Sequence, residues 1–182
     1  NVLPYFKKSE SIEGLDETYR NKSGPLKLSR SSEGNELSKV YLEAAEQAGY
    51  EINNDMNGYK QEGFGLMDTT IYGGRRQSTS VTYLHPVINR RNLTVITNTI
   101  VNKVIIENNK AVGVECTRGK EIKKIHAENE VILSAGAINS PQLLMLSGIG
   151  SADELKKLDI SVQHDLRGVA VSYTHLTLPT TS

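Results

Sequence analysis

A short apolar segment that runs straight into small residues is the feature that most constrains this chain. Glu130-Val131-Ile132-Leu133-Ser134 leads into Ala135-Gly136-Ala137, and Ser140-Pro141 follows closely. A nearly continuous apolar run of this length predicts a strand that is covered on both faces. Proline is favoured in the first turn of a helix, so Ser140-Pro141 predicts a helix start. We therefore expect a buried strand that turns sharply into a helix ending near Gly148.

A junction of this kind is also a place where a ligand can approach the main chain. Small residues leave the backbone accessible, and the helix directs its free amide hydrogens and positive dipole end towards an electron-rich group. In open α/β sheets, nucleotides bind in the crevice beyond the carboxyl ends of the strands. Taken alone, however, Gly and Ala at a strand–helix turn are more often explained by close packing, so the junction by itself assigns no ligand.

The first half of the chain predicts helices joined by loops. Residues 10–35 are rich in Ser, Gly, Lys and Glu and predict an exposed connection. One amphipathic helix is expected from Glu36 to Gly49, and a second from Ser78 to Arg90, kinked or divided at Pro86. Their expected inward-facing side chains are Leu37, Val40, Tyr41, Ala44 and Ala48 in the first helix, and Val81, Leu84, Val87 and Ile88 in the second.

The second half predicts strands and then helices. Asn108-Asn109 is typical of a hairpin turn. The expected strands are Leu93–Thr97, Val101–Ile106, Ala111–Thr117 and Glu121–Ala127, the last three forming an antiparallel meander. A further helix is expected from Ala152 to Leu158. The order of elements predicts a mixed α/β fold, a three-layer domain with a meander on one side.

Composition excludes several classes of protein. Lys plus Arg equals Asp plus Glu at 21 each, so the overall charge does not favour nucleic acid or an anionic membrane. No apolar run approaches the length of a membrane-spanning helix. The single cysteine, Cys116, excludes an internal disulfide and a zinc site of several thiolates. The histidines lack metal-ligand spacing. They are His85, His126, His164 and His175, and we assign no metal site and no catalytic residue.

A resemblance to a known family emerges from motifs along the chain. Gly136 to Gly150, GAINSPQLLMLSGIG, resembles the second signature of the glucose–methanol–choline (GMC) FAD-dependent oxidoreductases along its whole length. Further segments resemble the same family in the same order, from Val2 to about Val169. These segments are Val2–Glu10, Gly24–Leu26, Asp55–Gly58, Gly63–Gly65, Gly74–Ser78, Asn92–Val95 and Ala111–Glu115.

The resemblance implies a fold and a domain arrangement. It implies an incomplete Rossmann-like FAD-binding domain with a β-meander, interleaved with part of a substrate domain built on an antiparallel sheet. Residues 1–169 would belong to the family's N-terminal, FAD-binding domain, with about 26–90 lying towards the substrate-domain side. Residues 170–182 carry no family sequence, and we interpret them as an appended or frameshifted tail.

The resemblance also implies a cofactor and a reaction. In the family an alcohol carbon passes a hydride to the flavin of FAD, while a histidine near the C-terminus takes the hydroxyl proton; the partner is thus a small-molecule alcohol. Val101 matches a position whose main chain contacts the adenine part of FAD, and Ala135 and Gly136 match the turn that lies against the cofactor. From pattern alone, Val101 is an ordinary strand residue.

Parts of the family pattern are absent from this sequence. Gly63–Asp68 and Gly148–Asp153 both fail as glycine-rich dinucleotide fingerprints, so we expect the fingerprint to lie before Asn1. Arg167 replaces a family proline, and no histidine matches the catalytic position. We therefore expect an inactive fragment of an FAD-dependent alcohol oxidoreductase. Two alternatives stay open: a flavin-containing lyase that cleaves cyanohydrins, and a non-catalytic paralogue. Choline, glucose, aryl and steroid alcohols all remain possible substrates.

Overall fold

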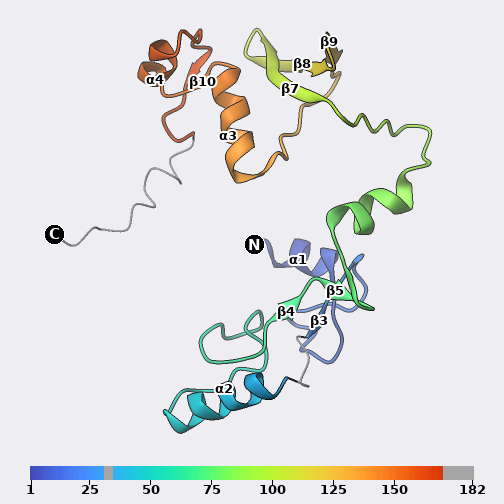
Figure 1. The fold of residues 1–182 in the computed structure, drawn as a ribbon, viewed down its shortest axis with the longest axis vertical. Helices are drawn as coiled ribbons and strands as arrows, with labels where there is room; N and C mark the ends of the chain where they lie inside the picture. The colour runs from blue at the N-terminus through green and yellow to red at the C-terminus, as the bar shows by residue number, and fades with distance from the viewer. Residues whose placement is uncertain (31–34, 170–182) are drawn as a thin grey trace, which may run out of the picture. The chain divides into compact units, whose positions relative to one another are not determined.

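The chain divides into two compact units, Asn1–Val95 and Ile96–Ser182. A computed structural model describes residues 1–30 and 35–169 (Figure 1). The tail expected at 170–182, with His175, lies outside the described residues. Helices and short strands alternate throughout, and the largest sheet in the described residues has three strands. The mixed α/β character predicted from the sequence is confirmed.

The first unit contains short elements separated by long loops. Its helices are α1 (Leu3–Ser9), α2 (Glu36–Gln47), the π-helix η1 (Ser80–Leu84) and the 3-10 helix η2 (His85–Val87). Its strands are β1 (Glu10–Ser11), β2 (Leu26–Lys27), β3 (Ser29–Arg30), β4 (Asp68–Thr69), β5 (Ile71–Tyr72) and β6 (Arg75–Arg76). β1 pairs with β2 in parallel, whereas β3–β4 and β5–β6 are antiparallel pairs.

The second unit is built on the predicted meander. Strands β7 (Ile100–Glu107), β8 (Lys110–Arg118) and β9 (Glu121–His126) form one antiparallel sheet in the order β7-β8-β9. Asn108 and Asn109 both have positive φ, 51° and 61°, which suits the hairpin that joins β7 to β8. The unit continues with α3 (Gly136–Leu146), β10 (Ile149–Gly150), α4 (Ala152–Lys157) and β11 (His164–Asp165).

Helix α3 begins four residues before the predicted start. Its first residue is Gly136, and Pro141 lies inside it. Ser140, expected at the helix start, instead uses its hydroxyl to accept a hydrogen bond from the Ala135 amide at 3.0 Å. Pro141 is tolerated because only the Ala137 carbonyl loses its usual partner, and Ala137 is exposed to water. The proline was therefore misleading as a marker of the first turn.

Two predicted strands do not form. Residues 130–134 and 93–97 join no sheet in the described residues, and Ile132, expected to be buried, is 74% exposed. Composition indicates which residues favour an extended backbone, but a strand also needs a neighbour that accepts and donates its hydrogen bonds. Nothing in the described ranges supplies that neighbour.

The two helices predicted in the first unit form, but the side chains that they bury are not the predicted ones. Asn35 caps α2 by accepting from the Leu37 amide, and Gly49 follows the helix with φ +84°, as the sequence suggests. The buried residue of α2 is Ala45, not the predicted stripe. The second helix is divided at Pro86 into η1 and η2, and its buried residue is Thr82, while Val81 and Ile88 are exposed.

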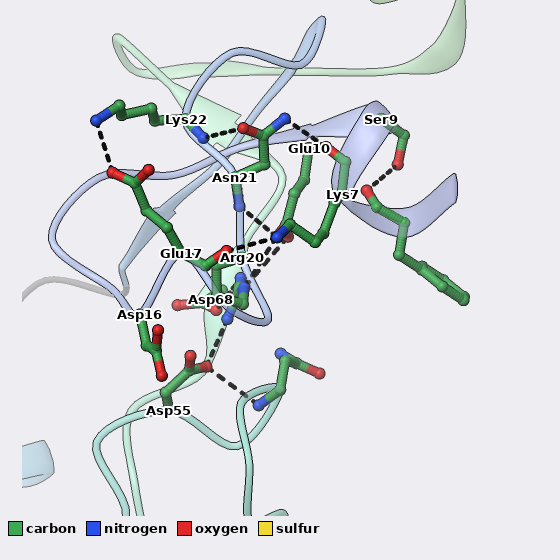
Figure 2. Close-up of polar contacts among 12 residues, drawn as sticks. Lys7, Ser9, Glu10, Asp16, Glu17, Arg20, Asn21, Lys22, Asp55 and Asp68 are labelled. Atoms are coloured by element: carbon green, nitrogen blue, oxygen red, sulfur yellow. Dashed lines mark hydrogen bonds and ion pairs between the residues drawn. The ribbon is translucent and has the colours of Figure 1, made fainter. Parts of the chain in front are cut away.

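The segment predicted to be an exposed connection is instead the anchor of the first unit. Arg20 is 3% exposed and forms ion pairs with Glu10, Asp55 and Asp68 (Figure 2). Ile12 is buried nearby in sequence, at 6% exposure. The prediction failed because it counted polar residues without their partners: Asp55 and Asp68 come from distant loops and strands, so the local sequence carries no sign of them.

Candidate functional site

The sequence-predicted residues Val101 and Ala135 line the same cavity in the second unit. The cavity measures about 560 Å³, and it also contacts Val114, Leu133 and Leu143. Val101 is the second residue of strand β7, and Ala135 immediately precedes helix α3. The lining is mainly aliphatic, and its polar members are Thr99, Ser134, Asn139 and Gln142. Such a surface suits a flat, largely apolar group better than a small charged one.

Strand β7 is held in place beside α3 by one buried hydroxyl. Ser147, at the end of α3, accepts a hydrogen bond from the Val104 amide at 2.8 Å. The same hydroxyl donates to the Leu143 carbonyl at 2.6 Å. Val104 and Ser147 are both buried, so water does not compete with these bonds. Strand β7 and the C-terminal end of α3 are therefore held against each other at this point.

Gly136 adjoins the cavity and has a backbone that favours glycine. Its φ is +88°, in the left-handed region that side chains disfavour. A Cβ added there would meet no atom within 4 Å, so the requirement comes from the backbone conformation and not from crowding. The main chain at Gly136 is thus open on the side where a side chain would otherwise stand.

The first turn of α3 carries amide hydrogens that the described residues leave unpaired. No side chain caps the helix, and the Ser140 hydroxyl accepts only from Ala135. The amides of Gly136, Ala137 and Ile138 have no acceptor in the described part of the chain. Free amide hydrogens at a helix start attract electron-rich groups. The turn and the cavity together offer an aliphatic surface next to a cluster of donors.

A second cavity also borders the unpaired segment 130–134. It measures about 510 Å³, and its lining includes Val104, Ile149 and His164. Val131 and Leu133 line both cavities, so this segment is bordered by open space at two cavities.

The three described histidines are His85, His126 and His164. His85 has the Ser80 hydroxyl 3.4 Å from its Nε2, and its side chain is exposed. His126 and His164 are also exposed. In residues 1–30 and 35–169, no histidine forms an ion pair with a carboxylate, and no group of three or more His, Cys, Asp or Glu side chains is placed to hold a metal.

Among the helices of the described residues, none has the length and hydropathy of a membrane-spanning segment.

The ion cluster around Arg20 is the feature that sequence reasoning missed. Arg20 Nε lies 3.0 Å from Glu10 Oε1, and Nη2 lies 2.9 Å from Asp68 Oδ2, while Nη1 pairs with Asp55. Burial acts to lower the pKa of Arg20, but the hydrogen bonds that its guanidinium donates to Glu10 and Asp68 outweigh it and raise the pKa above the ordinary value. Arg20 thus stays charged, and it joins strand β1, the loop at Asp55 and strand β4.

The donor set at the first cavity fits part of a dinucleotide. Aliphatic walls at Val101 and Leu143 suit a planar ring, and the free amides at Gly136–Ile138 suit polar oxygens. A glycine-rich loop that would hold a pyrophosphate is not found in the described residues. The described residues therefore offer only part of what a dinucleotide site needs.

Comparison with protein families gives one match over nearly the whole chain. Residues 1–168 match the family model described as GMC oxidoreductase. Mitochondrial choline dehydrogenase of Mus musculus is 51% identical over 169 residues, 93% of this chain and 28% of that protein. Oxygen-dependent choline dehydrogenase of Rhizobium etli is 45% identical over 172 residues, 94% of this chain and 31% of that protein. The chain thus spans less than a third of the length of these relatives.

Comparison with solved structures also finds oxidoreductases that are longer than this chain. An FAD-dependent oxidoreductase from Chaetomium thermophilum superposes with a TM-score of 0.84 and 27% identity, covering 92% of this chain and 32% of that one. Pyridoxine 4-oxidase from Mesorbium loti superposes with a TM-score of 0.80 and 29% identity, covering 90% and 32%. The described fold is therefore that of a contiguous part of larger oxidoreductases.

Proposed function

Because this chain belongs to the GMC oxidoreductase family, we propose that it is part of a longer FAD-dependent enzyme, the parent protein, that oxidises an alcohol. The observation that carries the proposal is the convergence of Val101 and Ala135 on one cavity at the uncapped start of α3. These residues are far apart in the sequence, and their meeting point has the aliphatic and amide lining that a nucleotide needs.

The contribution of this chain is to bind and orient the cofactor. The main chain near Val101 would hold the adenine end of FAD, and the open backbone at Ala135 and Gly136 would let the cofactor approach closely. When bound, FAD supplies the hydride acceptor for the alcohol carbon. Most side chains at the cavity are aliphatic and would exclude water, while the main chain would provide polar contacts.

The remaining parts of the site belong to the parent protein outside these residues. We place the glycine-rich fingerprint and the histidine that takes the hydroxyl proton there, since neither has a counterpart in the described residues. We also propose that residues 26–90 face the substrate-domain side. In support, the first unit is compact by itself and ends at Val95, close to that boundary. By itself this chain would hold FAD weakly and turn over no substrate.

Choline is the alcohol that the similarity favours. Choline dehydrogenases of a mammal and of a bacterium share 51% and 45% of residues with the chain. The residues that would select the alcohol are not among those that we assign here, so the proposal rests on the relatives alone. Other alcohols serve as controls when this proposal is tested.

The test uses the purified parent protein under anaerobic conditions. We expect bound FAD in the visible absorbance spectrum, and bleaching of that absorbance when choline is added. Aryl and sugar alcohols serve as controls for the substrate class. A parent protein without flavin would refute the assignment of the cavity. Bound flavin that stays oxidised with every alcohol would instead favour a lyase or a non-catalytic paralogue.

A further inference from the structure

Helix α2 carries two apolar surfaces, of which its own unit buries only one. Ser38, Leu42 and Ala45 face the loops of the first unit, and Ser38 and Leu42 line a small cavity together with Ile52. On an adjacent side of the helix lie Leu37, Val40 and Tyr41, which are 77%, 58% and 58% exposed. Their spacing of three and four residues places them in one stripe. Tyr50, 59% exposed, follows the helix. We call these four residues the outer α2 surface.

Charged residues occupy a different sector of the helix. Glu36 and Lys39 form an ion pair at 3.6 Å, and Glu43 and Glu46 lie on the same side at helical spacing. The circumference of α2 is thus divided into a charged sector, a buried sector and, between them, an exposed stripe without charge. A helix that meets water on two sides normally carries polar residues on both. The composition of the stripe is therefore that of an interior surface.

Aromatic packing already orders one edge of this surface. The Tyr41 and Phe64 rings have centroids 5.6 Å apart, and the Tyr50 and Phe64 rings 5.0 Å. Phe64 is thus held between two tyrosines. The Asn35 cap and the left-handed Gly49 fix the two ends of the helix. The outer α2 surface is consequently preformed and not a loose segment.

The length of the relatives indicates what covers this surface. Nearly all of this chain matches them, yet the match accounts for only 28–31% of their length, so roughly seven-tenths of such a protein lies outside it. Large, uncharged and aromatic surfaces are typical of permanent packing, whereas reversible complexes use more polar ones. These two facts together favour packing within one polypeptide over a transient partner.

We propose that the outer α2 surface is the seat for a segment of the parent protein that lies outside these 182 residues. The segment packs on Leu37, Val40 and Tyr41 and turns the exposed stripe into a core. The proposal rests on family membership and not on the cofactor or the alcohol, so it stands or falls separately from the proposed function.

The experiment compares hydroxyl-radical oxidation of Tyr41 and Tyr50 in the unmodified parent protein and in the 182-residue chain, read by peptide mass spectrometry. We expect both tyrosines to react roughly tenfold more slowly in the parent protein, because packing excludes the radical. Tyr72, which is exposed on strand β5 and outside the surface, serves as an internal reference. Equal oxidation of Tyr41 and Tyr50 in the two samples would overturn the proposal.

A thiol-labelling series in the parent protein adds an independent measurement. Leu37→Cys on the stripe is compared with Glu43→Cys on the charged sector, both in full-length protein. We expect the Leu37→Cys thiol to be protected and the Glu43→Cys thiol to label at once. Protection that vanishes on dilution to monomers would identify a second copy as the cover, and would also overturn the proposal.

Discussion

The two units of this chain hold themselves together in opposite ways. In the first unit a charged side chain, Arg20, is buried to 3% exposure and joins three carboxylates. In the second unit the most buried side chain is Leu155 at 1%, and its other buried residues include Val104, Cys116 and Leu143. One unit is thus organised by directed ionic contacts and the other by apolar packing.

The two kinds of interior also differ in how far apart in the sequence the contacting residues lie. The meander of the second unit pairs consecutive strands, so its contacts are local. Arg20 in the first unit reaches partners 10, 35 and 48 residues away. An ionic cluster can connect short, irregular segments that share little apolar surface. Its cost is that every partner must be present, since an unpaired buried charge is strongly unfavourable.

The largest expected effect is the loss of the Arg20 cluster. Arg20→Met leaves three carboxylates without their cation and should destabilise the first unit by about 3–5 kcal/mol. Hydrogen exchange should accelerate in residues 1–95 and stay unchanged in the meander. Lys22→Met removes the exposed pair with Glu17 and should have almost no effect. If both variants exchange like the wild type, the ionic account of this unit is wrong.

The apolar counterpart is Leu155. Leu155→Ala removes the most buried side chain of the second unit and should cost about 2–5 kcal/mol through lost burial and a residual cavity. Exchange should accelerate in residues 96–169 only. The matched control is Leu158→Ala, because Leu158 is 66% exposed. Faster hydrogen exchange in both units after Leu155→Ala would show that the two units do not unfold separately.

A substitution of Ser147 tests whether one polar contact contributes to the stability of the mainly apolar second unit. Ser147→Ala leaves the buried Val104 amide without an acceptor and should cost about 1–3 kcal/mol. The amides of β7 and the end of α3 should lose protection together, measured by hydrogen exchange. Ser161→Ala, at an exposed position, is the control. Independent behaviour of the strand and the helix would contradict the role of this hydroxyl.

The smallest expected effect is at Gly136. Gly136→Ala places a side chain at φ +88° and should cost about 1–2 kcal/mol from backbone strain alone, since a Cβ meets no neighbour. Gly168→Ala, which also meets no neighbour but has no left-handed φ, should be nearly neutral. Urea unfolding of the second unit measures both. A Gly136→Ala variant as stable as the control would remove the argument for an obligatory glycine.

Sequence reasoning succeeded where structure depends on neighbouring residues. The β7–β8 hairpin follows from Asn108-Asn109 and the β-branched segments around it, and α2 follows from its amphipathic pattern. It failed where distant partners decide: the Arg20 cluster, the exposed stripe of α2 and the unpaired run at 130–134. Val101, Ala135 and Gly136 were taken from the family resemblance; the first two line one cavity, and a cofactor role for all three stays a prediction. Pattern alone would have left Val101 as a strand residue.

The Ser147 hydroxyl has a consequence for the stiffness of the second unit. It links the Val104 amide on strand β7 to the C-terminal end of α3, so the edge of the sheet and the helix are joined by a directed bond as well as by apolar packing. Elements joined in this way lose little further conformational freedom if a ligand binds beside them.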